Sequence, residues 1–223
     1  MHLHYLMETI IIIAFSLLSY LLGSLPSSVW ISRAYHGIDI REHGSGNAGA
    51  TNTFRILGNK IGIIVLTLDI LKGITAASLV MFLGSIAHGT DRYINIQLLF
   101  GLCAVLGHLF PVYVNFKGGK GIATLLGMAI GIDYALALAC IALFILVLFL
   151  TRYVSLSSIL ATISFPVFAI FIFKRHEPLL IAFGIVAVII VILTHQKNIK
   201  NLWSGEENKA NLFKKKIINE SNQ

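Results

Sequence analysis

The sequence predicts an all-α integral membrane protein with about seven transmembrane helices. Of 223 residues, 57% are hydrophobic and only 12% are charged, against about 25% charged in an ordinary soluble domain. Long apolar stretches alternate with polar segments that carry most of a net charge of +7. This pattern is typical of a polytopic membrane protein with basic cytosolic loops. It excludes a soluble globular protein, a disordered chain and a nucleic-acid binder.

Six apolar stretches are candidate membrane spans, and all but the fourth have close to the roughly 17 to 25 residues that a spanning helix needs. They cover residues 9–25, 61–83, 94–114, 121–150, 154–173 and 178–194. The fourth would be about 45 Å long as a single helix, against a hydrocarbon core of roughly 30 Å. A turn at Gly131-Ile132-Asp133-Tyr134 divides it into a short crossing that ends near Ile132 and a second one from Tyr134. The expected total is then seven.

The distribution of Lys and Arg supports seven crossings over six. Seven crossings with the N-terminus outside place 13 of these residues in cytosolic segments and 3 outside, whereas six crossings divide them 8 against 8. Because cytosolic loops are enriched in Lys and Arg, we expect the N-terminus outside and the C-terminus in the cytosol. Every polar, glycine-rich loop then lies on the cytosolic face. We expect one membrane domain over residues 1–210 and a basic, polar tail over 211–223.

The first polar loop, residues 39–58, combines glycines with short hydrogen-bond donors. Its glycines are Gly44, Gly46, Gly49 and Gly58, and its polar side chains include Ser45, Asn47, Thr51, Asn52 and Arg55. Glycines let backbone N–H groups form a concave nest for phosphate, and a guanidinium adds charge-assisted bonds. The alternative is a re-entrant turn packed through small residues. The spacing of Gly44, Gly46 and Gly49 matches a dinucleotide fingerprint, but no βαβ unit surrounds it.

The second loop contains the segment Gly118-Gly119-Lys120-Gly121, just before an apolar helix. It lacks the spacing of a nucleotide-binding P-loop, since Val114 and Gly121 occupy the positions of the required glycine and hydroxyl. A lysine among glycines at a helix N-terminus nevertheless favours an anion. Lys117 is better explained as an interfacial lysine whose stem lies along apolar surface.

Two further polar segments flank spanning helices on the same predicted face. In residues 194–207, His195 and Asn198 are spaced i, i+3, so they would share a face if the helix continued. His195 is a candidate acid or base, a phosphate ligand or only a helix cap, and Ser155 is a candidate cap. Within the second span, Asp69 and Lys72 are also spaced i, i+3 and predict a structural ion pair. Neither Cys103 nor Cys140 has a spacing that suggests a disulfide, a metal or another cofactor.

Together these motifs resemble one family, the acyl-phosphate-dependent glycerol-3-phosphate acyltransferases of bacterial inner membranes. The resemblance extends from about residue 8 to 210 and rests on five segments: residues 23–26, 44–52 with Arg55, 107–111 with 118–121, 152–156, and His195 through Asn198 to Glu207. One departure is Gly205-Glu206-Glu207, where Gly-Thr-Glu is common, so either glutamate could supply the acidic contact.

The resemblance implies transfer of an acyl group from acyl phosphate to the 1-hydroxyl of sn-glycerol 3-phosphate, which gives lysophosphatidic acid and phosphate. It implies a multi-pass inner-membrane enzyme with a cytosolic active site, no cofactor, and functional coupling to a soluble enzyme that produces acyl phosphate. Chain-length preference and oligomeric state stay open. Other glycerol-phosphate acyltransferases have a His-x-x-x-x-Asp dyad, which none of the eight histidines begins here.

We therefore expect direct attack of the glycerol hydroxyl on the acyl carbonyl, with the proton taken by the phosphate of the donor or, as alternatives, by His108 or His195. The donor would be held and polarised by the loop residues Lys120, Arg55, Ser45, Asn47, Thr51 and Asn52, with the glycines at 44, 46, 49, 118, 119 and 121. Glycerol 3-phosphate would be bound by His195, Asn198 and a loop cation, with Ser155 bridging.

Rival interpretations are a transporter for organic phosphates and a structural membrane protein. Transport sites also use glycine-rich helix breaks, but no inverted repeat is visible, and the glycine-rich loops are expected on one face rather than at the membrane midplane. A structural role does not require two loops that pair glycines with cations. Within the enzyme class, acyl-CoA is the competing donor, because it too carries phosphates.

Overall fold

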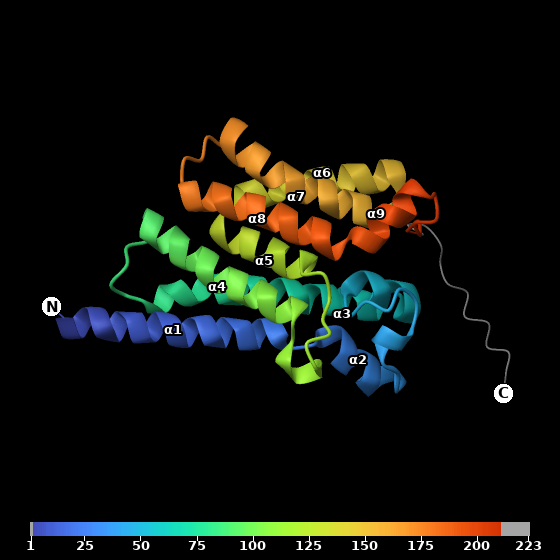
Figure 1. Ribbon diagram of the computed structural model, residues 1–223, viewed down its shortest axis with the longest axis horizontal. Coiled ribbons are helices and arrows are strands. Elements are labelled where there is room, and N and C mark those ends of the chain that lie inside the picture. The colour runs from blue at the N-terminus through green and yellow to red at the C-terminus, as the bar shows by residue number, and fades with distance from the viewer. Residues whose placement is uncertain (1, 211–223) are drawn as a thin grey trace.

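The structure is a computed structural model that describes residues 2–210 (Figure 1). Within these residues the chain is helical and has no strand. The elements are α1 (His2–Ser24), α2 (Ser27–His36), η1 (Ile40–Glu42), α3 (Ala50–Ser78), η2 (Leu79–Phe82), α4 (Asp91–Leu109), η3 (Val112–Val114), α5 (Ile122–Ile132), α6 (Tyr134–Thr151), α7 (Val154–Phe171), α8 (Pro178–Thr194) and α9 (Gln196–Trp203). The predicted tail, residues 211–223, lies outside the described residues.

Local sequence signals explain where several helices begin and end. Pro26 separates α1 from α2, and Pro178 occupies the first turn of α8, where its missing N–H costs nothing. The Thr90 hydroxyl accepts a hydrogen bond from the Tyr93 N–H at the start of α4 (3.3 Å). At the predicted turn, Asp133 accepts one from the Leu136 N–H (3.1 Å) and begins α6. The division of the fourth apolar stretch between Ile132 and Tyr134 is therefore confirmed.

The number of full-length spans in the described residues differs from the number of predicted segments. Five helical spans are long and apolar enough to cross a bilayer, or six if α8 and α9, which are bent by 65°, count as one. The remaining helix, α5, has 11 residues, or about 16 Å against a core of roughly 30 Å. Seven apolar segments are thus helical as predicted, but one is short. The seven-crossing topology and its orientation stay predictions.

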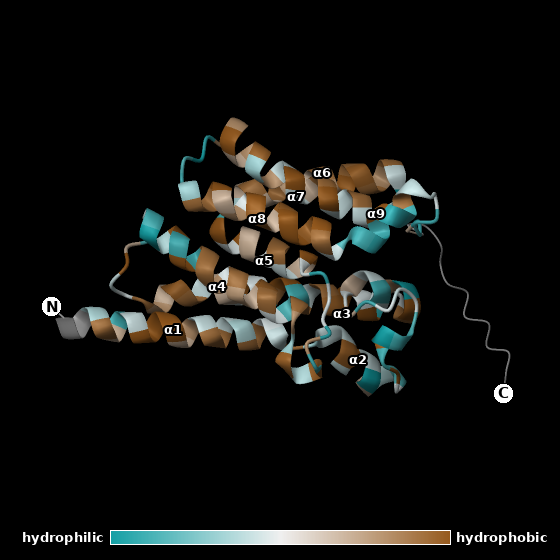
Figure 2. Cartoon of the chain, viewed as in Figure 1, coloured by the Kyte–Doolittle hydropathy of each residue, from teal (hydrophilic) through white to brown (hydrophobic). Residues whose placement is uncertain are grey.

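The helices pack into two groups joined by α5 (Figure 1). Helices α1, α3 and α4 lie together, α6, α7 and α8 form the second group, and α5 contacts α3, α4 and α6. The larger buried apolar cluster joins α4 through α8, and in it the rings of Phe165 and Phe183 meet edge to face at 6.2 Å. Many large apolar side chains remain exposed on the outer faces, as a protein surrounded by lipid requires (Figure 2).

Two glycines bring α3 and α5 into close contact. A Cβ atom added to Gly73 would lie 2.1 Å from the Thr124 carbonyl oxygen, and one added to Gly127 would lie 1.9 Å from the Ile70 carbonyl oxygen. Small residues allow helix backbones to approach this closely in a membrane. Because α5 begins directly after Gly121, this crossing also fixes the position of the segment that contains Lys120.

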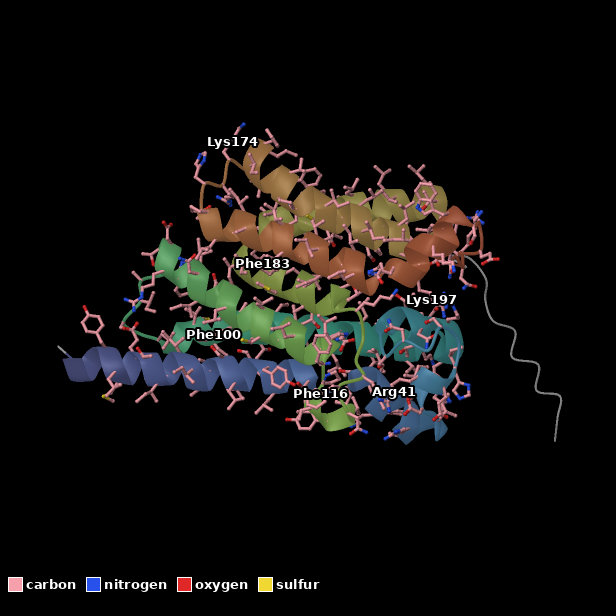
Figure 3. The ribbon with its side chains drawn as sticks, viewed as in Figure 1. Arg41, Phe100, Phe116, Lys174, Phe183 and Lys197 are labelled. Carbon is pink, nitrogen blue, oxygen red and sulfur yellow. The ribbon has the colours of Figure 1, made fainter. Side chains whose placement is uncertain are left out.

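The polar loops gather at one end of the molecule. The α2–α3 loop and α9 lie at the right of Figure 2, with the α4–α5 loop nearer its lower centre. Arg41 and Lys197 lie on the right-hand side of Figure 3, whereas Lys174 lies towards the opposite end. The predicted placement of the glycine-rich loops on one face agrees with this arrangement. Which face is cytosolic is not determined by the helices themselves.

Candidate active site

The first loop is closed by the amide of Asn52, which is 1% exposed. Its nitrogen donates hydrogen bonds to the carbonyl oxygens of Ile40 (3.0 Å) and His43 (2.9 Å), and its oxygen accepts one from the Ser45 N–H (3.0 Å). A Cβ atom on Gly44, whose φ is +62°, would lie 2.4 Å from that oxygen. Asn52, predicted to contact substrate, is thus buried and shapes the loop.

Charged side chains join the first loop to the second. Arg41 donates two hydrogen bonds to the Asp39 carboxylate (3.0 and 2.7 Å) and one to the Val114 carbonyl oxygen (3.2 Å). Arg33 also pairs with Asp39 (2.8 Å). The hydrogen bonds from Arg41 hold the pKa of Asp39 well below its usual range. The carboxylate therefore stays ionised and fixes Arg41 as a bridge between the loops.

The second loop rests on His108, the next-to-last residue of α4. The Gly119 N–H donates to the His108 carbonyl oxygen (3.2 Å). Added Cβ atoms would lie 2.0 Å from that oxygen on Gly118, and 2.4 Å from His108 Nε2 on Gly119. His108 itself is 8% exposed. The glycines at 118 and 119 thus allow close packing, and His108 lies beneath the loop rather than on its open side.

Lys120 begins a hydrogen-bonded chain of side chains that joins four segments. Its ammonium donates to the Asn198 side-chain oxygen, and the Asn198 nitrogen donates to Glu207 Oε1 (2.7 Å). The Ser155 hydroxyl donates to the same carboxylate oxygen (2.7 Å). The structure therefore brings together Lys120, Asn198, Ser155 and Glu207, four of the predicted site residues, from the second loop, α9, α7 and the segment after α9.

Of the two glutamates between which the sequence did not decide, Glu207 makes the acidic contact. Glu207 is half-buried, whereas Glu206 is exposed. The backbone N–H groups of both donate to the Asn201 carbonyl oxygen (2.8 and 3.1 Å). This turn directs Glu207 toward Ser155.

Positive charge gathers around Lys120. The pKa of Lys120 is lowered to about 8, chiefly by burial; the Glu207 carboxylate opposes this shift, and the charges of Arg55 and Lys197 add to it. Burial destabilises the ammonium form of Lys120, and an anion bound beside it would stabilise that charge. Arg55 is exposed on the first turns of α3, and Ser45 and Thr51 are exposed beside it in sequence, with Asn47 half-buried. Gly49 directly precedes α3, so the positive end of that helix dipole lies at the loop.

His195 lies at the bend between α8 and α9, so the helix does not continue through it as the i, i+3 argument assumed. Its Nδ1 lies 2.9 Å from the Val191 carbonyl oxygen, which satisfies part of the helix end. The residue is 3% exposed. His195 therefore caps α8, and burial, followed by the positive charge of Lys120, lowers the pKa of its imidazole to about 4.

An apolar groove opens next to this site. It is lined by Tyr153, Leu156, Ile159, Ile192, Ile199, Leu202 and Trp203. Leu156 directly follows Ser155, and Ile199 directly follows Asn198. The same two segments thus supply both the polar chain and the walls of the groove, which sequence analysis did not identify.

The predicted ion pair of Asp69 and Lys72 is present and buried, with 2.6 Å between Lys72 Nζ and Asp69 Oδ1. Sequence analysis did not connect it with the site. Asp69 Oδ1 lies 3.8 Å from His108 Nδ1, although the two residues are far apart in the chain. The only signal in the sequence was the presence of charged residues inside an apolar span.

Comparison with known proteins agrees with this geometry. The family model of glycerol-3-phosphate acyltransferases matches residues 13–205. The glycerol-3-phosphate acyltransferase of Fusobacterium nucleatum is 42% identical over 195 residues, which cover 87% of this chain and 96% of that protein. That of Chlorobium phaeobacteroides is 43% identical, covering 86% and 93%.

Two crystal structures of PlsY (YgiH), an integral membrane glycerol 3-phosphate acyltransferase, share the fold at 36% identity. The glycerol 3-phosphate form has a TM-score of 0.79 and covers 89% of this chain and 95% of its own. The lysophosphatidic acid form has a TM-score of 0.76 and covers 89% and 94%. The fold and the site therefore define an integral membrane acyltransferase. The chain belongs to the glycerol-3-phosphate acyltransferase family.

Glu207 provides a test of the hydrogen-bonded chain. We expect Glu207→Ala to lower kcat/KM for glycerol 3-phosphate about ten- to a hundredfold, because Asn198 and Ser155 lose a shared charged acceptor. Glu206→Ala is the matched control, since that side chain is exposed. Steady-state kinetics in isolated membranes measure both. Equal losses in the two variants would contradict the assignment.

Proposed function

We propose that this enzyme transfers a fatty acyl group from acyl phosphate to the 1-hydroxyl of sn-glycerol 3-phosphate and releases lysophosphatidic acid and phosphate. The observation that carries the proposal is the contact of Lys120 with Asn198, which places an ammonium between two glycine-rich loops and the polar edge of α9. Two phosphate-bearing substrates need cations and backbone donors in one place. Membership of the glycerol-3-phosphate acyltransferase family supports glycerol 3-phosphate as the acyl acceptor.

The two substrates divide the site between them. The donor phosphate is bound by Lys120 and by the open side of the first loop, with Arg55, Ser45, Asn47 and Thr51. Glycerol 3-phosphate is bound by His195, by one of the loop cations, and by Asn198 and Ser155, whose side chains the Glu207 carboxylate orients. The glycines at 44, 46, 49, 118, 119 and 121 let the backbone approach the phosphates, and Asn52 holds the first loop in shape.

The acyl chain lies in the groove between α7, α8 and α9. Its walls are apolar, it begins beside Ser155 and Asn198, and its entrance is bordered by Trp203, which is 90% exposed. A phosphate at Lys120 and a chain in this groove would place the acyl carbonyl between them. Burial of each methylene contributes about 0.8 kcal/mol to binding.

The reaction is a direct displacement. The glycerol oxygen forms a bond to the acyl carbonyl carbon, the bond between that carbon and the phosphate oxygen breaks, and the departing phosphate takes the hydroxyl proton. The developing negative charge is stabilised by Lys120 and Arg55. His108 is buried beneath Gly119, which favours the phosphate over His108 as the base. His195 is the remaining alternative.

Acyl phosphate is proposed as the donor because of the family resemblance and because no His-x-x-x-x-Asp dyad is present. The basic loops favour the cytosolic face of a bacterial inner membrane as the location of the site, where a soluble enzyme would supply acyl phosphate.

The decisive experiment offers purified protein either acyl phosphate or acyl-CoA together with glycerol 3-phosphate, and measures lysophosphatidate and phosphate release. Product from acyl phosphate alone supports the proposal. Product from acyl-CoA alone would overturn the donor, and no product from either would overturn the reaction. Counterflow of glycerol 3-phosphate in proteoliposomes without lipid product would instead indicate transport.

The pKa of Lys120 leads to a pH dependence. The ammonium is charged below pH about 8 and is lost above it, whereas phosphate monoesters, with a second pKa of about 6, stay fully ionised. We therefore expect kcat/KM to fall about tenfold for each pH unit above 8. In Lys120→Arg the guanidinium stays charged, so this decline should vanish whatever the residual activity. An unchanged decline in that variant would assign it to another group.

A further inference from the structure

A buried polar cluster lies beneath the second loop. Lys72 donates to Asp69 Oδ1 (2.6 Å) and to the Leu25 carbonyl oxygen. His108 Nδ1 lies 3.8 Å from Asp69 Oδ1 and 3.2 Å from the Thr124 hydroxyl oxygen. The four side chains, from α3, α4 and α5, are at most 8% exposed. The mechanism proposed above uses neither Asp69 nor Lys72.

The far side of the His108 ring reaches the point where the two glycine-rich loops meet. A Cβ atom on Gly119 would lie 2.4 Å from His108 Nε2 and 2.6 Å from the Ala48 carbonyl oxygen. The Gly119 N–H also donates to the His108 carbonyl oxygen. Gly119 directly precedes Lys120, so a turn of the imidazole would displace the residue next to the phosphate-binding ammonium.

Lys72 connects the same cluster to the break between α1 and α2. Its acceptor, the Leu25 carbonyl, directly precedes Pro26. The cavity between this turn and the second loop is only about 10 Å³, about the least that admits one water molecule. The cluster is therefore tightly packed, and a change in one member must move its neighbours.

We propose that Asp69 and Lys72 are positioning residues of the phosphate site and act through His108. The Thr124 hydroxyl lies within hydrogen-bond distance of His108 Nδ1 (3.2 Å), and the Asp69 carboxylate, 3.8 Å from the same nitrogen, favours this orientation of the ring through its negative charge. Lys72 is the ion-pair partner of Asp69 and compensates its buried negative charge. The oriented ring supports Gly119 and so keeps Lys120 in register with Asn198. This inference rests on the proposed role of Lys120.

The test compares two buried carboxylates. Asp133 is the matched control, because its side chain is 9% exposed and it pairs with Arg175 (2.7 Å), yet it contacts none of the site residues. We expect Asp69→Asn and Asp133→Asn both to lower the thermal midpoint. Only Asp69→Asn should lower kcat/KM for glycerol 3-phosphate, by about a hundredfold, as a misplacement of about 1 Å would.

A double variant separates positioning from stability. Lys72→Met alone leaves a buried carboxylate without its partner, whereas Asp69→Asn/Lys72→Met removes both charges, so the double variant should regain stability. It should not regain activity, because His108 still lacks its carboxylate. Activity that recovers in step with stability would overturn the inference, as would equal kcat/KM in the two single aspartate variants.

Failure of the proposed reaction is distinguishable from failure of this inference. A wild-type protein that forms no lysophosphatidate overturns the reaction. In that case the thermal shift caused by inorganic phosphate, the simplest ligand for Lys120, decides the inference. A shift that is lost in Asp69→Asn and kept in Asp133→Asn supports the positioning role, and an equal shift in both variants overturns it.

Discussion

Lys120→Ala is expected to lower kcat/KM about a hundred- to a thousandfold, the range found when one group that stabilises developing charge is removed. The substitution removes the ammonium from between the loops and leaves the Asn198 side-chain oxygen without its donor. The substitution should therefore weaken both the binding of phosphate and the stabilisation of the transition state. We expect KM to rise and kcat to fall. Initial rates of lysophosphatidate formation over a range of both substrates measure the two effects.

Lys117→Ala is the control for that experiment. Lys117 belongs to the same loop but is exposed, and the same net charge is lost. We expect it to keep most of the wild-type activity. A Lys120→Ala enzyme that retains near-native turnover would refute the role of Lys120 in phosphate binding, and equal losses in both variants would attribute the effect to the net charge of the loop.

Gly127→Val is expected to prevent the protein from accumulating in a folded form. The Cβ atom of either alanine or valine would lie 1.9 Å from the carbonyl oxygen of Ile70, so both must push α3 and α5 apart, and the two further methyl groups of valine increase the separation that is needed. Gly127→Ala should be folded but less stable, with a thermal midpoint lower by about 5 to 10 °C, from an overpacking cost of about 1 to 3 kcal/mol. Thermal unfolding of detergent-solubilised protein measures this.

The glycine series also tests how α5 positions Lys120. Gly84→Ala is the control, because a Cβ atom there would meet nothing within 4 Å. In folded Gly127→Ala, kcat/KM should fall more than the loss of folded protein explains, since α5 begins two residues after Lys120. A specific activity per folded molecule equal to the wild type would contradict this connection.

Much of the fold could be predicted because its signals are local. The turn before Tyr134 depends on a glycine and a capping aspartate within a few residues, and the structure has the break there. The short length of α5 was equally visible in the sequence. Whether such a helix crosses the bilayer depends on its neighbours, which composition does not encode. The bend at His195 was missed because no proline or glycine marks it.

The candidate site was predictable as a set of residue types and not as a set of contacts. Glycines beside Arg55 and Lys120 indicate phosphate binding through local chemistry. That Asn52 would close its own loop depends on the path of the backbone from Ile40 to Ser45. That Asp69 would lie against His108 depends on how α3 and α4 pack. The choice of Glu207 over Glu206 depends on a turn whose two N–H groups share one carbonyl oxygen.

The hydrogen-bonded series of side chains from Lys120 to Glu207 also has a consequence for synthesis of the protein itself. Its members enter the growing polypeptide in the order Lys120, Ser155, Asn198 and Glu207, and the last lies near the end of the described chain. While the ribosome is still adding α7 and α8, the second loop has its support from His108 but no partner for its ammonium. In the proposed site, therefore, the complete set of contacts can form only after Glu207 has been added, and an amino-terminal fragment that stops before Asn198 lacks two of the four side chains.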